Sequence, residues 1–81
     1  MADLRYIPLQ SSQIMGVAYD LDEKRLYCQF NNATWYEYDD VPPETVLQVI
    51  IARSQGSAFN DKVKKGNFVY RKLDEEPETH A

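Results

Sequence analysis

The amino-acid sequence predicts an α+β fold: a small antiparallel sheet with one long and one short helix packed on it, in the order β-β-β-α-α-β. Apolar residues occupy every second position from Met15 to Leu21, which is the pattern of a strand with one buried face. From Pro42 onward the apolar residues are three and four positions apart, as in an amphipathic helix. A chain of 81 residues forms one domain at most, and such a domain buries about 60% of its unfolded surface.

The first half of the chain is predicted to form three successive strands, at residues 14–21, 26–30 and 34–39. A charged turn at residues 22–24 separates the first two. A tight hairpin between the second and third is predicted at residues 31–33, Asn-Asn-Ala, because asparagine tolerates a left-handed backbone better than most residues. Three such strands form an antiparallel meander.

A long helix is predicted over about residues 42–54, where two prolines and an acidic residue begin it. Proline has no hydrogen bond to lose in the first helical turn, and acids are favourable at the positive end of the helix dipole. We expect Val46, Val49 and Ile50 to face the sheet. Gly56 should end this helix.

A shorter helix is expected next, with Ser57 as its cap and Gly66 at its exit. Phe59 and Val63 lie four positions apart and would form its apolar side. The apolar residues at 68–70 and at 73 then predict a fourth strand.

The remaining segments are predicted to lie outside this domain, which spans residues 11–73. Residues 1–10 have no period and contain Pro8, so we expect an extended N-terminal arm. Residues 74–81 have no large apolar side chain and should form a disordered acidic tail. The longest apolar run, residues 49–52, is far shorter than the roughly 18 residues of a membrane span. We therefore expect a cytoplasmic protein with no membrane partner.

The residues needed for catalysis are scarce. His80 is the only histidine and lies in the predicted tail, where it cannot be held for general-base work. Cys28 is the only cysteine and alternates with Leu26 and Phe30, so it is expected to be a small buried side chain. We predict no enzyme activity, no catalytic residues, no metal and no cofactor.

Charge is distributed unevenly along the chain. Residues 1–44 contain three basic and eight acidic residues, whereas residues 45–73 contain six basic residues and one acidic residue. These cations either solvate the surface or form a basic face for an anionic partner. The candidate nucleic-acid-binding residues are Arg53, Lys62, Lys64, Lys65, Arg71 and Lys72.

The order of residues between about Ser11 and Leu73 resembles that of the KTSC domain family, named for a C-terminal region of lysyl-tRNA synthetase and also found as small bacterial and phage proteins. The residues that carry this resemblance most specifically are Tyr36, Tyr38, Val41, Pro42, Ser54, Gly56, Phe59 and Asn60. The family usually has glycine in the turn before the tyrosine pair, where this chain has Asn32 and Ala33. The resemblance implies no established activity, and RNA binding is the usual suggestion for the family.

Two functions therefore remain. The first is weak RNA binding that is insensitive to sequence and strongly reduced by salt, because it would depend on phosphate neutralisation by the six cations. The isoelectric point of 4.8 argues against it. The second is a protein-interaction module, which would use an exposed strand edge or an aromatic surface formed by Trp35 and Tyr27 if the helices cover Tyr36 and Tyr38.

Overall fold

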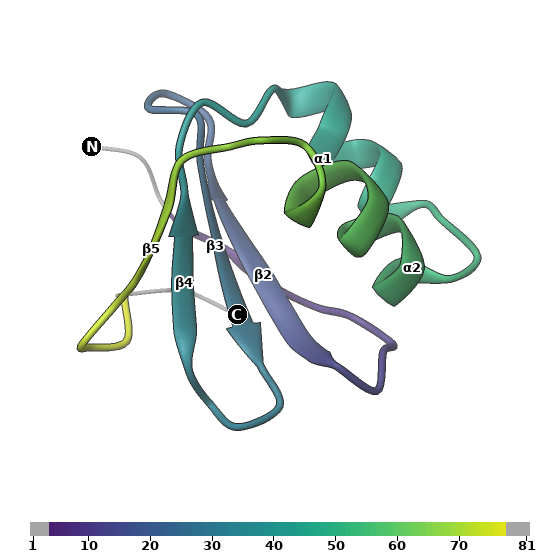
Figure 1. Cartoon of the computed structure of the whole chain (residues 1–81), viewed down its shortest axis with the longest axis horizontal. Helices are drawn as coiled ribbons and strands as arrows, with labels where there is room; N and C mark the ends of the chain where they lie inside the picture. Colours follow the sequence, from purple (N-terminus) through teal and green to yellow (C-terminus); the bar gives the residue numbers. More distant parts are fainter. Residues whose placement is uncertain (1–3, 78–81) are drawn as a thin grey trace.

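The computed structural model describes residues 4–77 and shows one sheet with helices on one of its faces (Figure 1). The sheet has five antiparallel strands in sequential order. The elements are β1 (Tyr6–Pro8), β2 (Ile14–Asp20), β3 (Arg25–Phe30), β4 (Trp35–Tyr38), α1 (Pro43–Ile50), α2 (Gln55–Phe59), its π-helical continuation η1 (Asn60–Lys64), and β5 (Tyr70–Lys72). The predicted α+β class, the meander and the two helices are confirmed.

The predicted number of strands was wrong, because residues 6–8 form an additional edge strand, β1. This strand pairs with β2 and places Tyr6 opposite Ala18. Its sequence gave no signal because three residues are too few to show a period, and proline is tolerated in a sheet mainly at an edge. A Cβ atom on Gly16 would collide with the tip of the Tyr6 ring, so glycine at this position lets the ring approach β2 closely.

The turn between β3 and β4 lies where it was predicted, but its left-handed residue is Ala33 rather than an asparagine. Ala33 has φ 65°, and its N–H donates to the carbonyl of Phe30 at 2.8 Å. A side chain with a Cβ atom is unfavourable in this conformation, and glycine is favourable. A glycine would therefore suit this position of the turn better than the alanine of this chain.

Both helices differ from the prediction at their ends. Helix α1 stops at Ile50 rather than 54, and its buried residues are Val46 and Val49, whereas Ile50 is only partly buried. The second helix begins one turn earlier than expected, because the side chain of Ser54, not Ser57, accepts the capping hydrogen bond. After η1 the left-handed residue is Asn67 rather than Gly66.

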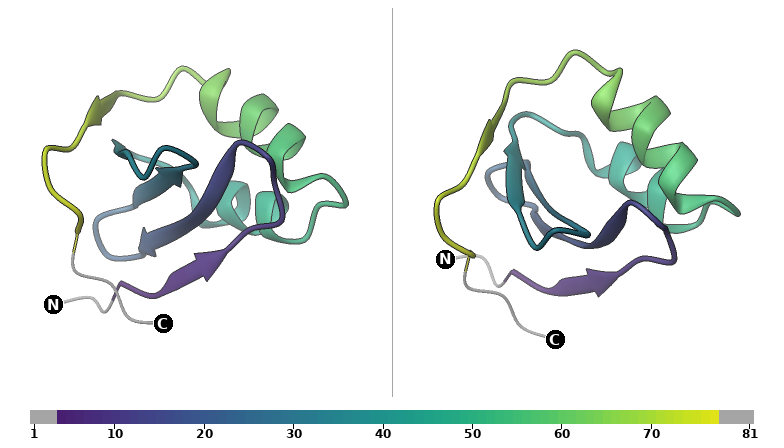
Figure 2. Two further views of the ribbon diagram at one scale, coloured as in Figure 1. Left: turned by 90° about the horizontal axis from the view of Figure 1, so that it is seen from below. Right: turned by 60° about the horizontal axis from the view of Figure 1, so that its bottom comes forward.

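The helices pack on what we call the helix face of the sheet. The core there combines side chains of β2, β3 and β4 with those of both helices; its members include Val17, Leu26, Cys28, Tyr38, Val49, Phe59 and Val63. Figure 2 shows the sheet curving, with β1 and β5 as its two edges and the helices along one side. The opposite side of the sheet is called the reverse face below.

The reverse face buries two large side chains although no helix covers it. Trp35 is only 4% exposed. The Tyr6 ring packs edge-on against it at a centroid distance of 6.0 Å. Leu73 donates a backbone hydrogen bond to the Trp35 carbonyl at 2.9 Å, which holds the chain after β5 beside this residue. The expectation of an exposed aromatic surface at Trp35 and Tyr27 was therefore wrong.

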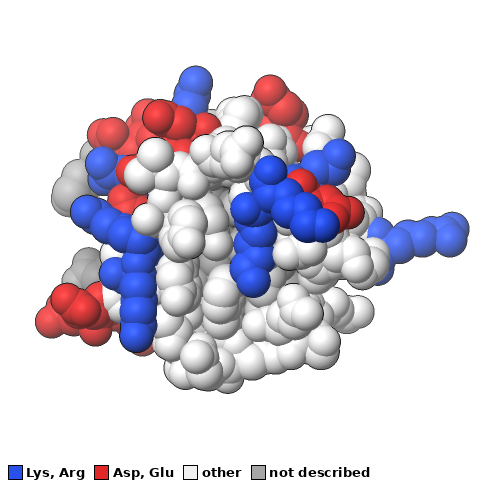
Figure 3. All heavy atoms as spheres, viewed as in Figure 1, with Lys and Arg blue, Asp and Glu red and all other residues white. Residues whose placement is uncertain are grey.

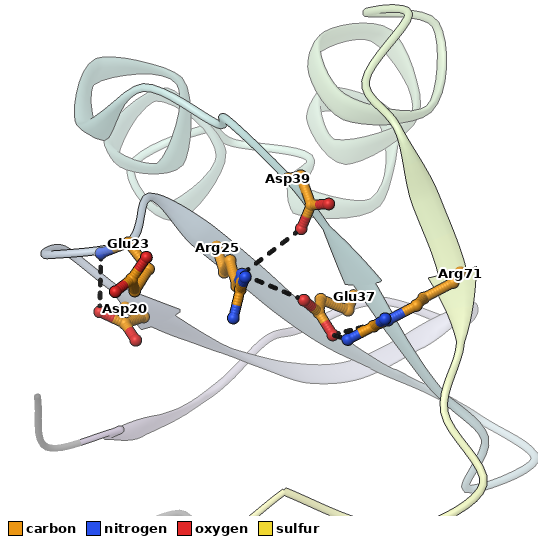
Figure 4. Close-up of polar contacts among 6 residues, drawn as sticks. All are labelled: Asp20, Glu23, Arg25, Glu37, Asp39 and Arg71. Carbon is orange, nitrogen blue, oxygen red and sulfur yellow. Dashed lines mark hydrogen bonds and ion pairs between the residues drawn. The ribbon is translucent and has the colours of Figure 1, made fainter. Parts of the chain in front are cut away.

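The second buried side chain of the reverse face is Glu37, which is 3% exposed. One carboxylate oxygen lies 3.2 Å from Arg25 Nε, and the other accepts from Arg71 Nη2 at 2.8 Å (Figure 4). Asp39 Oδ1 lies 3.6 Å from the same Arg25 nitrogen. Two guanidinium groups from neighbouring strands thus neutralise one buried carboxylate and connect β3, β4 and β5.

Candidate functional site

An aromatic cleft opens on the helix face, where the sheet edge meets the end of the second helix. It is lined by Phe30 of β3, Tyr36 and Tyr38 of β4, Tyr70 of β5, and Lys64 of η1, and its volume is about 300 Å³. The register of β5 against β4 forms one wall of the cleft, because Tyr70 is paired with Tyr38 and Lys72 with Tyr36. Side chains of paired residues lie on the same face of a sheet. The pairing of β5 with β4 therefore completes the cleft.

The rings of the cleft are packed against one another and partly open to solvent. Phe30 stacks on Tyr36 with centroids 5.1 Å apart, and Tyr38 stacks on Tyr70 at 5.4 Å. Phe59 lies beneath them and contacts both Phe30 and Tyr38 edge-on. Tyr70 is 61% exposed, and Phe30 and Tyr36 are half-buried. The cleft thus presents aromatic surface to a ligand on a rigid base.

Lys64 is the charged residue of the cleft. Its Nζ lies over the Phe30 ring, 5.2 Å from the centroid, which is within the range of a cation–π contact. Burial raises the pKa of the Tyr38 phenol further above its ordinary value of 10.0, and a phenol is neutral at physiological pH in either case. The cleft therefore combines neutral aromatic groups with one ammonium group.

The six candidate cations do not form one patch. Lys64 lines the cleft, and Lys72 is paired with Tyr36 at its β5 side. Arg71 is bound to Glu37 on the reverse face. Lys65 lies 3.8 Å from Asp61 on its own helical segment.

The other two cations are exposed on the helical side of the molecule. Arg53 is in the connection between α1 and α2, and Lys62 is in η1. Figure 3 shows basic side chains along β5 and over the second helix, with uncharged surface between these two groups. The arrangement is that of an aromatic surface with cations on both sides.

Two further hollows continue from the cleft past Lys64. The middle hollow, of about 440 Å³, shares Phe30 and Lys64 with the cleft and is also lined by Gln13, Asn31 and Asn32. The distal hollow, of about 450 Å³, shares Gln13 and Lys64 with the middle one. No Asp or Glu of the described part of the chain, residues 4–77, lines the cleft or either hollow.

Three of the residues that carry the family resemblance meet in the distal hollow, namely Ser54, Gly56 and Asn60. Ser54 caps α2, and a Cβ atom on Gly56 would lie 2.5 Å from the Ser11 hydroxyl oxygen. These two therefore have structural reasons to be there. Asn60 makes no side-chain hydrogen bond to another residue in the range 4–77.

The other residues of the resemblance divide between the cleft and the core. Tyr36 and Tyr38 line the cleft. Phe59 and Val41 are buried, and the Val41 carbonyl accepts a hydrogen bond from the Tyr19 hydroxyl at 2.5 Å. Pro42 precedes the first turn of α1. Most of the motif therefore maintains the fold, and a smaller part is available to a ligand.

Other chemistry can be located as well. Cys28 is buried, and burial raises the pKa of its thiol well above the ordinary value of 9.0. Residues 4–77 contain no group of three potential metal ligands. No helix in this part of the chain has the length and hydropathy needed to cross a membrane. The last four residues of the predicted tail, which include His80, lie outside the described residues.

The KTSC domain family model matches residues 10–72, which include both helices and every strand except β1. The chain belongs to the KTSC domain family. A crystal structure of a KTSC domain protein from Yersinia pestis superposes with a TM-score of 0.77 at 36% sequence identity, covering 86% of this chain and 97% of that one. The fold described above is therefore that of a solved KTSC domain.

Two bacterial relatives extend the comparison. An uncharacterized protein from Stutzerimonas stutzeri is 32% identical over 71 residues, which is 88% of this chain and all of that protein. A protein from Tsukamurella paurometabola is 37% identical over 57 residues, which is 70% of this chain and 85% of that protein. Both support membership of the family, and neither has a description that names a function.

Proposed function

We propose that this KTSC domain is a non-enzymatic binding module whose ligand is single-stranded RNA. The observation that supports this function most strongly is the aromatic cleft with Lys64 at its border. Unpaired bases stack on exposed aromatic side chains, and a nearby cation attracts the phosphate that follows the stacked base. A double-stranded partner would not fit this geometry, because its bases are already stacked.

The charges at the cleft define how strong and how salt-dependent the binding should be. Of the six candidate cations, Lys64 lines the cleft, and Lys72 lies beside it on β5, paired with the cleft residue Tyr36. Each phosphate neutralised on a single strand contributes a slope of about −0.7 to the plot of log affinity against log salt. Two contacts give a slope of about −1.4. Weak binding is consistent with the net charge of −4 on the whole chain.

The experiment is an NMR amide-shift titration with a short single-stranded RNA at about 50 and about 200 mM salt. Shifts are expected at Lys64, Tyr36 and Tyr70. Tyr70→Ala should weaken binding by about 1–3 kcal/mol, the usual loss for one stacked base, and Lys64→Gln should reduce the salt slope. Arg53→Gln is the matched control, because this cation lies between the helices and lines none of the three cavities.

The second candidate function, protein binding, is favoured by one observation at the other side of β5. Val69 is 73% exposed beside Tyr70, and β5 is a short edge strand of the sheet, which a partner strand could extend. An absence of amide shifts with RNA even at low salt would contradict the RNA proposal. The β5 edge would then be the surface to test with protein partners.

A further inference from the structure

We infer that the RNA-binding site of this KTSC domain extends past Lys64 into the middle and distal hollows, where Gln13 and Asn60 select among the bases of the strand. This inference rests on the proposed function and adds a selectivity to it. A surface of scattered cations would bind every sequence alike, because contacts to phosphate carry no sequence information.

The aromatic cleft, the middle hollow and the distal hollow are continuous. Phe30 and Lys64 form part of both the aromatic cleft and the middle hollow. Gln13 and Lys64 form part of both the middle and the distal hollow. A strand whose base stacks in the cleft therefore has one direction in which the surface remains concave, and Lys64 is at the junction.

The middle and distal hollows are lined mainly by neutral polar side chains. Among the residues 4–77 that the structure describes, Lys64 is the only charged one that lines the two hollows. The remaining polar groups are neutral amides and hydroxyls. Amides and hydroxyls can donate to phosphate oxygens, but a side-chain amide also has an acceptor, so it can pair with the donor and acceptor of an unpaired base edge or with a ribose hydroxyl.

Some polar groups of the two hollows form hydrogen bonds within the fold, whereas others are free to bind a ligand. Ser11 Oγ accepts from the backbone of Gln13 and Ile14, and the Gln55 amide connects the Gln10 N–H to the Ile50 carbonyl. The Ser11 hydroxyl and the Gln55 side-chain amide therefore already form hydrogen bonds within the fold.

By contrast, the side-chain amide groups of Gln13 and Asn60 form no hydrogen bond to another residue in the described range 4–77. Asn60 and Lys64 are also the first and last residues of the π-helical turn η1. Such turns are rare within helices and frequently occur at functional sites. The two amides are therefore the groups to assign to base recognition.

The test compares RNA oligonucleotides of increasing length and different base composition, from dinucleotides to hexanucleotides, by fluorescence anisotropy at low salt. Homopolymers of each base are measured with the wild type and with the variant, because stacking alone gives some base preference and only the part lost in the variant reports the amides. The variant is Gln13→Ala combined with Asn60→Ala. Gln48→Ala is the matched control, because this exposed amide lies on α1 and lines none of the three cavities. An amide spectrum of each variant checks that the fold is retained.

We expect affinity to increase beyond the dinucleotide and to differ among homopolymers. The double variant should lower the affinity for the preferred longer strand about five-fold or more, the lower limit for one good amide–base pair, and should reduce the difference among bases. Dinucleotide binding and the Gln48→Ala variant should remain at the wild-type level.

Two results would overturn the inference, and they are distinguishable. If the double variant binds all strands as the wild type does, binding is confined to the aromatic cleft, and only the extension fails. If no oligonucleotide binds the wild type at low salt, the RNA function itself fails, and the extension fails with it.

Discussion

The two faces of the sheet bury their side chains by different means. On the helix face, Phe59 and Val49 of the helices cover Cys28 and Leu26, and the core is apolar throughout. On the reverse face, Trp35 is covered by a ring from β1, and Glu37 is held by two arginines. The first face depends on packing, whereas the second depends on pairing between strands that are distant in sequence.

This difference shows why the cleft is on the helix face and where it depends on the reverse face. The helices cover the middle of the sheet, including Tyr38, but leave Tyr36 of β4 half-buried and Tyr70 of β5 exposed. The same β5 strand is attached from behind, because Arg71 reaches Glu37 while the adjacent Tyr70 lines the cleft. Successive side chains of a strand point to opposite faces of the sheet, so β5 can contribute Tyr70 to the helix face and Arg71 to the reverse face.

The largest expected effect is on the helix face. Phe59→Ala should destabilise the fold by about 3–5 kcal/mol, because it removes a fully buried ring beneath Phe30 and Tyr38. The total stability expected for this length is only about 4–12 kcal/mol. Urea denaturation measures the loss. Leu47→Ala, at an exposed position of α1, should change it by less than about 0.5 kcal/mol; equal losses in the two variants would show that packing does not distinguish this face.

A smaller effect is expected on the reverse face. Replacing both Arg25 and Arg71 by Met should cost about 3 kcal/mol, because the buried Glu37 carboxylate would then have no cation partner. Glu37→Gln should cost less, about 1 kcal/mol, since both arginines are partly exposed and can be hydrated instead. Thermal melts with a double-mutant cycle measure these values. A larger loss for Glu37→Gln than for the double variant would contradict this account.

The smallest expected effect is a gain that leaves both faces unchanged. Ala33→Gly should stabilise the protein by about 1 kcal/mol, because it relieves a left-handed alanine in the β3–β4 turn. Chemical denaturation followed by a helix-face and a reverse-face reporter should show the same shift. An unchanged or lower midpoint would mean that the flexibility of glycine in the unfolded chain outweighs the relief of strain.

Much of this fold could be predicted from the sequence because its main elements have clear periods. The three central strands were predicted by alternation, and α1 by its stripe and its prolines. The register of β5 could not be predicted, since three exposed residues carry no pattern. Strand β1 has the same difficulty, and the π-helical turn has no recognisable sequence signal.

The candidate site was harder to predict than the fold. Lys64 was identified as a basic residue, and Tyr36 and Tyr38 as part of a motif, but nothing in their spacing indicates that they meet Phe30 and Tyr70. That contact depends on the pairing of β5 with β4 and on the length of the second helix. Charge counting likewise could not distinguish Arg71, which is used by Glu37, from Lys64, which lines the cleft.

The shortness of the two edge strands has a consequence for behaviour at high concentration. Strands β1 and β5 contain three residues each, so each edge offers few unpaired backbone groups on which a foreign strand could grow. Pro8 lacks an N–H on one edge, and Lys72 brings like charges together when two β5 edges approach. Long, flat and uncharged edges are the ones that lead sheets into fibrils. This architecture is therefore suited to remaining dispersed in a crowded solution.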